Sequence, residues 1–262
     1  MADRARRGGV RHAADVFLEA LYPERCIFCG RTERLVPAAG GCCSPCLALL
    51  PHRRPPDRLL TCRARPDPGS AVSAMPVVAA MYYEPPVRDI LLRLKFNRDA
   101  GLHPALSSLA VRALRMERAQ LTVWPDVVVA VPLHRARLRE RGFNQAGLIA
   151  GEVARTLGIA DRSDAVRRIR ATRRQSSVRD RTEREANTAG AFRVEDPFAV
   201  RGRSVLLVDD VLTSGATLQA FAEAVARFSP ASLAGLVIAS GRPPTLRTGR
   251  DEEPSAGTTP RP

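Results

Sequence analysis

Residues 204–228, SVLLVDDVLTSGATLQAFAEAVARF, constrain the fold of this chain more than any other segment. Residues 205–208 form a buried apolar run that is typical of a strand in a parallel sheet. Two adjacent acids end this run, and a short turn of small residues and an amphipathic helix follow. Because ligands of parallel sheets bind at the carboxyl ends of the strands, the segment predicts a polar binding site at this strand end.

Strand and helix patterns alternate along the rest of this region. Apolar runs at residues 127–131 and 233–239 predict further buried strands. Between them, apolar residues at helical spacing from Ala146 to Leu157 predict an amphipathic helix that ends at Gly158. This alternation predicts an α/β fold with a doubly wound parallel sheet.

The acids and the turn after them have the composition of a sugar-phosphate site. Asp209 and Asp210 accept hydrogen bonds and suit the two vicinal hydroxyls of a ribose. In the turn, hydroxyls and backbone N–H groups at a helix N-terminus can all point at one phosphate. The predicted phosphate-binding residues are Thr213, Ser214, Gly215, Ala216 and Thr217. A ribose 5-phosphate therefore fits the segment.

Other nucleotide-binding and hydrolytic motifs are absent from the sequence. A P-loop needs Gly-Lys-Ser/Thr, whereas the one lysine, Lys95, lies inside an amphipathic helix pattern. The acid pair is therefore not the partner of a P-loop. No two glycines stand two positions apart, which excludes the dinucleotide fingerprint. The HExxH and GxSxG motifs are absent as well.

The chain carries a strong positive charge that is concentrated near the predicted site. It holds 41 Lys+Arg and 27 Asp+Glu, a formal net charge of +14, and residues 134–184 include fourteen arginines against six acids. We expect Arg139 and Arg141 to bind pyrophosphate beside the first buried strand, and Arg173 and Arg174 to lie on a lid. A solvated basic face or a nucleic-acid surface is the alternative for the individual arginines.

Four of the six cysteines have the spacing of a metal site, C-x2-C-x13-C-x2-C. Two paired thiolates at this separation favour tetrahedral Zn²⁺. The predicted ligands are Cys26, Cys29, Cys43 and Cys46. Cys42 is a second choice for the third ligand. No export signal or run of about 18 apolar residues is evident, so we expect a cytoplasmic protein without membrane insertion.

Composition divides the chain into five parts. Residues 1–25 read as a basic arm with a short helix, residues 26–50 as a small zinc-ribbon-like module, and residues 51–69 as a Pro/Arg-rich linker. Residues 70–241 carry the α/β pattern. The tail, residues 242–262, has almost no apolar residues and is expected to be disordered.

The residues VLLVDDVLTSGAT match the phosphoribosyl pyrophosphate motif of the type I phosphoribosyltransferases, which the chain resembles. More narrowly, it resembles the ComF/GntX family over about residues 26–240. The supporting segments are LLRLKFNRD, VPLHRARLRERGFNQA, RIRATRRQSSVRDRTEREANTAGAFRV and the cysteine module. By this resemblance Asp209 and Asp210 hold the ribose hydroxyls, residues 213–217 the 5-phosphate, and the loop after Pro132 the pyrophosphate, while residues 170–181 form a mobile hood.

The resemblance also concerns the metal module and the cation at the site. The ComF family often carries two zinc ribbons, whereas Cys62 has no CxxC partner here. A second ribbon is therefore expected to be lost. Mg²⁺ is expected to bridge pyrophosphate and ribose oxygens and to keep several waters, with the aspartates mostly indirect.

Several functions follow from the resemblance and remain open at the level of sequence. The first is a phosphoribosyltransferase-like protein, a pentosyltransferase, that binds phosphoribosyl pyrophosphate or a related sugar phosphate and displaces pyrophosphate at C1. The second is a non-catalytic competence accessory for DNA uptake that binds single-stranded DNA or a competence helicase. Aromatic residues make up only 5% of the chain, which argues against base stacking. The third is a regulatory sensor of the sugar phosphate.

Overall fold

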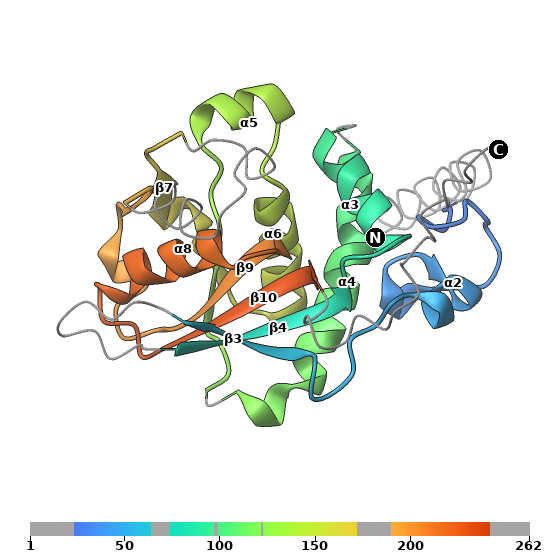
Figure 1. Ribbon diagram of the computed structural model, residues 1–262, viewed down its shortest axis with the longest axis horizontal. Helices are drawn as coiled ribbons and strands as arrows, with labels where there is room; N and C mark the ends of the chain where they lie inside the picture. The colour runs from blue at the N-terminus through green and yellow to red at the C-terminus, as the bar shows by residue number, and fades with distance from the viewer. Residues whose placement is uncertain (1–23, 64–73, 97–98, 122, 172–189, 242–262) are drawn as a thin grey trace, which may run out of the picture.

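A six-stranded sheet organises the part of the chain that the computed structural model describes, residues 24–63, 74–96, 99–121, 123–171 and 190–241 (Figure 1). The strands lie in the order β3-β4-β10-β9-β5-β6. Their bounds are β3 Leu59–Arg63, β4 Ala74–Tyr82, β5 Val127–Ala130, β6 Ala160–Asp161, β9 Ser204–Leu212 and β10 Ser232–Ser240. Neighbouring strands run parallel except for β3, which pairs antiparallel with β4. The predicted α/β fold with a doubly wound parallel sheet is confirmed, and the antiparallel edge strand β3 is an addition that the sequence analysis did not predict.

Helices cover both faces of this sheet (Figure 1). Alternate residues of β9 divide between two buried clusters. Leu206 and Val208 pack with helices α3 (Val87–Phe96), α4 (His103–Met116) and α6 (Gln145–Leu157). Val205 and Leu207 pack on the other face with helix α8 (Ala216–Ala226). Because both faces are buried, β9 is apolar from Val205 to Val208, as the unbroken run in the sequence indicates.

Shorter elements complete the described part of the chain. Strands β7 (Val166–Arg168) and β8 (Phe192–Val194) form a small antiparallel sheet beside α8. Phe192 meets Phe221 of α8 edge to face, with ring centroids 5.0 Å apart. The remaining helices are η1 Pro37–Ala39, α2 Ser44–Leu49, η2 Ala100–Leu102, η3 Arg118–Gln120, α5 Arg135–Arg141, η4 Ser163–Ala165 and η6 Pro197–Ala199.

The cysteine module packs directly against the α/β core (Figure 1). It contains the two-stranded sheet of β1 (Leu35–Val36) and β2 (Cys42–Cys43). Gly40 has a φ of 61°, and a Cβ atom there would lie 2.5 Å from the Cα atom of Ala105 in α4. Backbone therefore lies against backbone at this point. The buried cysteines of the module belong to the same apolar cluster as α4 and α6.

The stretch that the sequence suggests as a linker, residues 51–69, includes β3 and a buried arginine. Arg53 is fully buried and donates hydrogen bonds to the backbone oxygen of Asp57 (2.7 Å) and to Ser240 Oγ (2.8 Å). It also donates to the backbone oxygen of Gly241 at 3.1 Å and lies over the ring of Tyr82 at 4.5 Å. These contacts bind residues 51–63 to the ends of β4 and β10. The linker interpretation did not include them.

Several predicted features lie outside the described residues. They are most of the basic arm, the tail at residues 242–262, residues 64–69, and the lid arginines Arg173 and Arg174. The domain boundaries stay predictions. Within the described ranges, no helix has both the length and the apolar character needed to cross a bilayer.

The Arg53 contacts generate a stability prediction. We expect Arg53→Ala to lower the free energy of unfolding by about 3 kcal/mol, because three hydrogen bonds and a ring contact are lost in a buried setting. Arg54 is exposed, so Arg54→Ala is the matched control and should change stability by about 0.5 kcal/mol or less. Denaturant unfolding measures both, and equal effects of the two substitutions would contradict the assignment.

Candidate functional site

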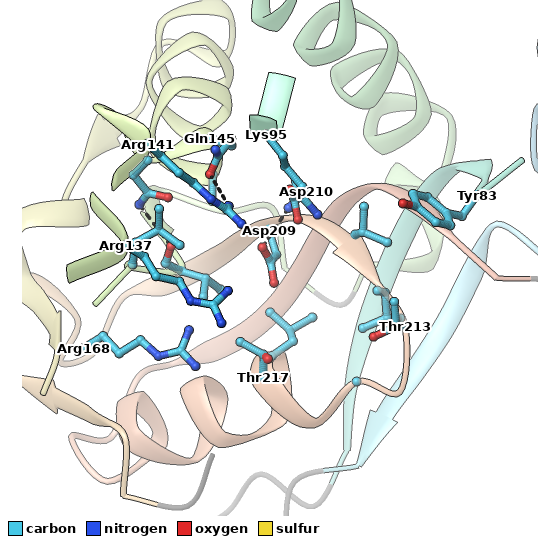
Figure 2. Close-up of a pocket in the computed structure, with 18 residues that line it drawn as sticks. Tyr83, Lys95, Arg137, Arg141, Gln145, Arg168, Asp209, Asp210, Thr213 and Thr217 are labelled. Carbon is cyan, nitrogen blue, oxygen red and sulfur yellow. Dashed lines mark hydrogen bonds and ion pairs between the residues drawn. The ribbon is translucent and has the colours of Figure 1, made fainter. Parts of the chain in front are cut away.

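A cavity lies at the carboxyl ends of β5 and β9 and is lined by side chains from several elements (Figure 2). The acid pair and the turn after it come from β9 and the start of α8. Cations reach the cavity from α3, α5 and β7. The polar residues that line it are Tyr83, Lys95, Arg137, Arg141, Asn144, Gln145, Arg168, Asp209, Asp210, Thr213 and Thr217. The fold thus brings the predicted acid pair together with a ring of positive charge.

The two acids lie next to each other at low solvent exposure. Asp210 is 8% exposed, and its backbone N–H donates a hydrogen bond to Asp209 Oδ1 at 2.8 Å. The Asp209 side chain points toward the space between Arg137 and Thr217 (Figure 2). Burial, followed by repulsion from the Asp210 carboxylate, raises the pKa of Asp209 to about 7. The pair is therefore a strained concentration of negative charge that suits hydroxyl groups or cations.

Lys95 compensates part of this charge. Its Nζ atom lies 2.8 Å from Asp210 Oδ2, and the two side chains are only 20% and 12% exposed. Burial disfavours the charged form of Lys95, but the Asp210 carboxylate outweighs it and holds the pKa of Lys95 above its usual value. Sequence reasoning missed this residue, because nothing in the local helix pattern distinguishes Lys95 from a solvated cation.

The turn after the acid pair has the geometry of an anion site. Strand β9 ends at Leu212 and α8 begins at Ala216, with Gly215 between them at a φ of 81°. The predicted residues Thr213, Gly215 and Thr217 line the cavity. The first N–H groups of an eleven-residue helix lie here, where an anion is favoured.

Two predicted residues of the turn lie differently. Ser214 is half-buried and is not among the residues that line this cavity, although the N–H of Ala216 points to its Oγ at 3.5 Å. Ala216 is buried at the start of α8. Its side chain supports the helix, and its backbone N–H belongs to the helix N-terminus.

The arginines at the site are not all those that the sequence suggested. Arg141 lines the cavity and donates a hydrogen bond from Nη1 to Gln145 Oε1 at 3.1 Å. Arg139 is exposed and does not line it, whereas Arg137 does. Helix geometry explains this difference. Positions 137 and 141 are four residues apart and share one face of α5, whereas position 139 points away from that face. The i, i+4 spacing of Arg137 and Arg141 was the signal that the sequence offered.

A third arginine comes from the small sheet beside α8. Arg168, at the end of β7, lines the same cavity. Burial, and then the nearby charge of Arg137, lower the pKa of Arg168. Clustered and partly desolvated guanidinium groups of this kind bind a multivalent anion well. Arg173 and Arg174 lie outside the described residues, so their place is not part of this geometry.

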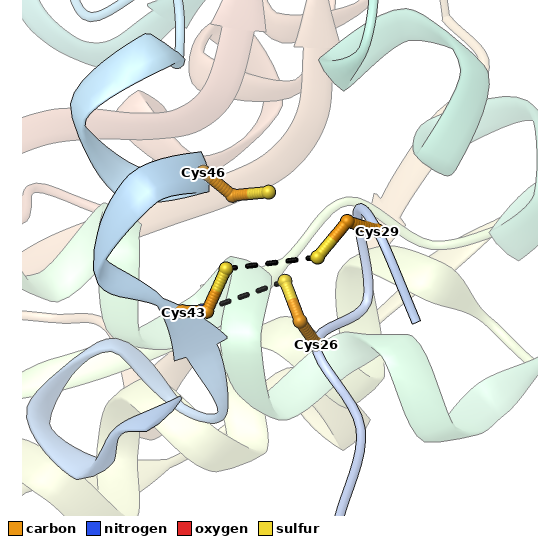
Figure 3. A group of neighbouring side chains, drawn as sticks. All are labelled: Cys26, Cys29, Cys43 and Cys46. Carbon is orange, nitrogen blue, oxygen red and sulfur yellow. Dashed lines mark hydrogen bonds between the residues drawn. The ribbon is translucent and has the colours of Figure 1, made fainter. Parts of the chain in front are cut away.

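The predicted cysteines form a tight group in the N-terminal module (Figure 3). The Sγ atoms of Cys26, Cys29, Cys43 and Cys46 all lie within 4.8 Å of one another. The Cys29 and Cys43 Sγ atoms are 3.6 Å apart. Four sulfurs about 2.3 Å from a tetrahedral zinc ion would be about 3.8 Å apart. The cluster is therefore consistent with zinc.

Strand geometry decides between Cys42 and Cys43. Both belong to β2, and neighbouring residues of a strand point to opposite faces. The Cys43 Sγ atom faces the other three sulfurs, while the Cys42 thiol is fully buried and donates to the backbone oxygen of Cys43 at 3.5 Å. The N–H of Cys43 donates to Cys26 Sγ at 3.4 Å. Burial opposes the Cys26 thiolate, but backbone N–H groups, with that of Cys43 foremost, lower its pKa to about 6.

An acid pair, a hydroxyl-lined turn and a helix N-terminus at one edge of a parallel sheet define a site of the phosphoribosyltransferase class. The phosphoribosyl transferase domain family matches residues 144–250, which contain these features.

Similar proteins assign the chain to a particular family within this class. The "DNA utilization protein YhgH" of Salmonella typhimurium is 32% identical over 213 residues, which cover 79% of this chain and 86% of that protein. The protein of the same name in Escherichia coli K12 is 35% identical over 173 residues, or 66% of this chain and 73% of the relative. "Competence protein F" of Haemophilus influenzae is 31% identical over 140 residues, with shares of 52% and 60%. The chain belongs to the ComF/YhgH family of phosphoribosyltransferase-domain proteins.

The choice of Cys43 over Cys42 predicts a difference between two neighbouring substitutions. We expect Cys43→Ala to lose most of the bound zinc, because one of four thiolates is removed. Cys42→Ala is the matched control and should keep about one zinc ion per chain. Zinc in the purified proteins is measured by mass spectrometry of the metal. Retention by Cys43→Ala together with loss by Cys42→Ala would reverse the ligand assignment.

Proposed function

We propose that the cavity binds phosphoribosyl pyrophosphate together with Mg²⁺ and that the protein transfers the phosphoribosyl group to an acceptor. The observation that carries this proposal is the meeting of an acid pair, a phosphate-binding turn and three arginines in one cavity. Each of these three features matches a different part of phosphoribosyl pyrophosphate. Phosphoribosyl pyrophosphate combines a vicinal diol with a monophosphate on one side and a pyrophosphate on the other.

The division of labour among the residues follows from their charge. Asp209 and Asp210 accept hydrogen bonds from the ribose hydroxyls. The turn from Thr213 to Thr217 and the N-terminus of α8 hold the 5-phosphate. The arginines Arg137, Arg141 and Arg168 hold the pyrophosphate. Because these cations stabilise the charge that develops on the leaving pyrophosphate, they promote cleavage of its bond to C1 without a side-chain nucleophile.

The residues fit a magnesium ion that arrives with the ligand. One oxygen of Asp210 is already engaged by Lys95, so few protein oxygens remain for a direct coordination shell. Mg²⁺ keeps several waters and prefers phosphate oxygens in such sites. When bound, Mg²⁺ neutralises part of the pyrophosphate charge.

We also propose that the cysteine cluster holds a structural zinc ion. Four thiolates leave no open position for a substrate, which is typical of a structural zinc site. The module contacts α4 on the face of the sheet opposite α8. We assign it to the stability of the domain.

The names of the relatives suggest the process that the protein serves. Relatives are called "DNA utilization protein" and "Competence protein F". We therefore propose that this chain also acts in DNA utilization or competence, in the cytoplasm, and that the phosphoribosyl pyrophosphate site is needed for that role. The net charge of +14 is compatible with a nucleic-acid partner, although exposed aromatic side chains at the cavity are few.

Ligand binding provides the direct test of the site. We expect phosphoribosyl pyrophosphate with Mg²⁺ to raise the melting temperature and to bind in calorimetry. Asp209→Asn should weaken binding at least about tenfold, because an amide with a single oxygen acceptor replaces a carboxyl group that accepts from the ribose hydroxyls. Asp126 is exposed at the other end of β5, so Asp126→Asn is the matched control. Undiminished binding by Asp209→Asn would argue against the assignment.

Complementation tests the proposed process. We expect this chain to restore growth on DNA as a nutrient to an Escherichia coli strain that lacks its YhgH protein, and the Asp209→Asn variant to fail at equal expression. Rescue by Asp209→Asn would separate the DNA role from the sugar-phosphate site. The Asp126→Asn variant controls for the effect of removing one acid.

A further inference from the structure

An ion pair between Lys95 and Asp210 lies at the cavity. Its atoms are 2.8 Å apart, and both side chains are largely shielded from solvent. Two adjacent carboxylates in such a setting need a counter-charge, because an uncompensated buried charge is costly. Many sites of this composition obtain the counter-charge from a divalent cation. In this chain an ammonium group is already in contact with the pair.

Lys95 is held in place by the helix that carries it. The apolar stripe of α3, formed by Val87, Ile90, Leu91 and Leu94, is at most 4% exposed. The residue directly before Lys95 is thus fixed in the core. Lys95 also lies in the last turn of α3, where the helix dipole favours a cation. The ammonium is therefore a preorganised part of the cavity, in contrast to a surface lysine that must be ordered on binding.

The identity of the residue supports a specific role. The chain has forty arginines and this single lysine. A guanidinium is a planar fork that pairs with both oxygens of one carboxylate, whereas an ammonium is a compact point charge with three donors. One donor on Asp210 leaves an ammonium able to reach a second oxygen acceptor in the cavity. An ammonium that contacts Asp210 and a ligand oxygen at the same time would bridge the two, as a small cation does.

We propose that the Lys95 ammonium acts as a built-in counter-cation of the acid pair, so that the cavity binds the pentose 5-phosphate part of its ligand without a divalent cation. This inference rests on the proposed function and deepens it. Mg²⁺ is then required by the pyrophosphate part of the ligand alone. Lys95 is a positioning residue for Asp210 and a contact for the pentose oxygens.

Ribose 5-phosphate, which lacks pyrophosphate, is the probe that separates these requirements. We expect the wild-type protein to bind it in calorimetry with a dissociation constant that changes less than about threefold between EDTA and excess MgCl₂. Lys95→Met should bind at least about tenfold more weakly in EDTA, because a charge-assisted contact is lost, and added MgCl₂ should restore most of the loss. A lysine that only supports the fold would show no such rescue by Mg²⁺.

Two further variants sharpen the experiment. Arg93 is an exposed cation on the same helix and pairs with Asp99. The Arg93→Met variant should bind ribose 5-phosphate like the wild type. Lys95→Arg keeps the charge but changes its shape, and it should recover only part of the affinity. Wild-type binding of ribose 5-phosphate that requires Mg²⁺, or full binding by Lys95→Met in EDTA, would overturn the inference while leaving the proposed function in place. Failure of the wild type to bind even phosphoribosyl pyrophosphate with Mg²⁺ would overturn the proposed function.

A ligand-free measurement checks the counter-cation role separately. The pKa of Asp209 is already raised above its usual value by burial and by Asp210, and Lys95 opposes that rise, so removing Lys95 raises this pKa further and more stability is lost as pH rises. The difference in melting temperature between wild type and Lys95→Met should therefore be small near pH 5 and larger near pH 8. The other titratable or charged side chains that line the cavity are the same in both proteins: Tyr83, Arg137, Arg141, Arg168, Asp209 and Asp210. A difference that does not vary with pH would contradict the role.

Discussion

The repulsion between two neighbouring carboxylates at the end of β9 is the constraint to which the surrounding structure responds. Asp210 donates its own N–H to Asp209, and Lys95 pairs with Asp210 from α3. Arginines from α5 and β7 complete the positive ring. Because these cations come from segments far apart in sequence, only the folded chain assembles the counter-charge that the partly buried acid pair needs. This concentration of charge is unfavourable in the ligand-free protein, but it suits the hydroxyl and phosphate groups of a sugar diphosphate.

The central motif of the site could be predicted from sequence because it is local. Strand, acids, turn and helix follow one another in residues 204–228, and the structure places them in that order. Which arginines of α5 line the cavity depends on the face of the helix on which each one lies. Arg139 and Arg137 are equally basic in the sequence, and only the face of α5 decides which of them lines the cavity.

Contacts between distant segments were beyond the reach of sequence patterns. Lys95 meets Asp210 across more than a hundred residues, and no spacing rule links the two. Arg53 was hidden for a different reason, since a Pro/Arg-rich stretch reads as solvated chain. Its burial depends on Tyr82 and on the end of β10. The C-x2-C spacing, by contrast, already favours Cys43 over Cys42, and the alternation of β2 gives the structural reason.

The close approach of Gly40 to α4 gives the cysteine module an influence beyond its own few residues. Helix α4 lies against β4 and β10, so any loosening of the module removes support from the centre of the sheet. If the four thiolates hold zinc, loss of the metal would weaken this support and leave a larger fraction of the chains open to proteolysis. Cells starved of zinc would then contain less of the whole protein, the α/β domain included.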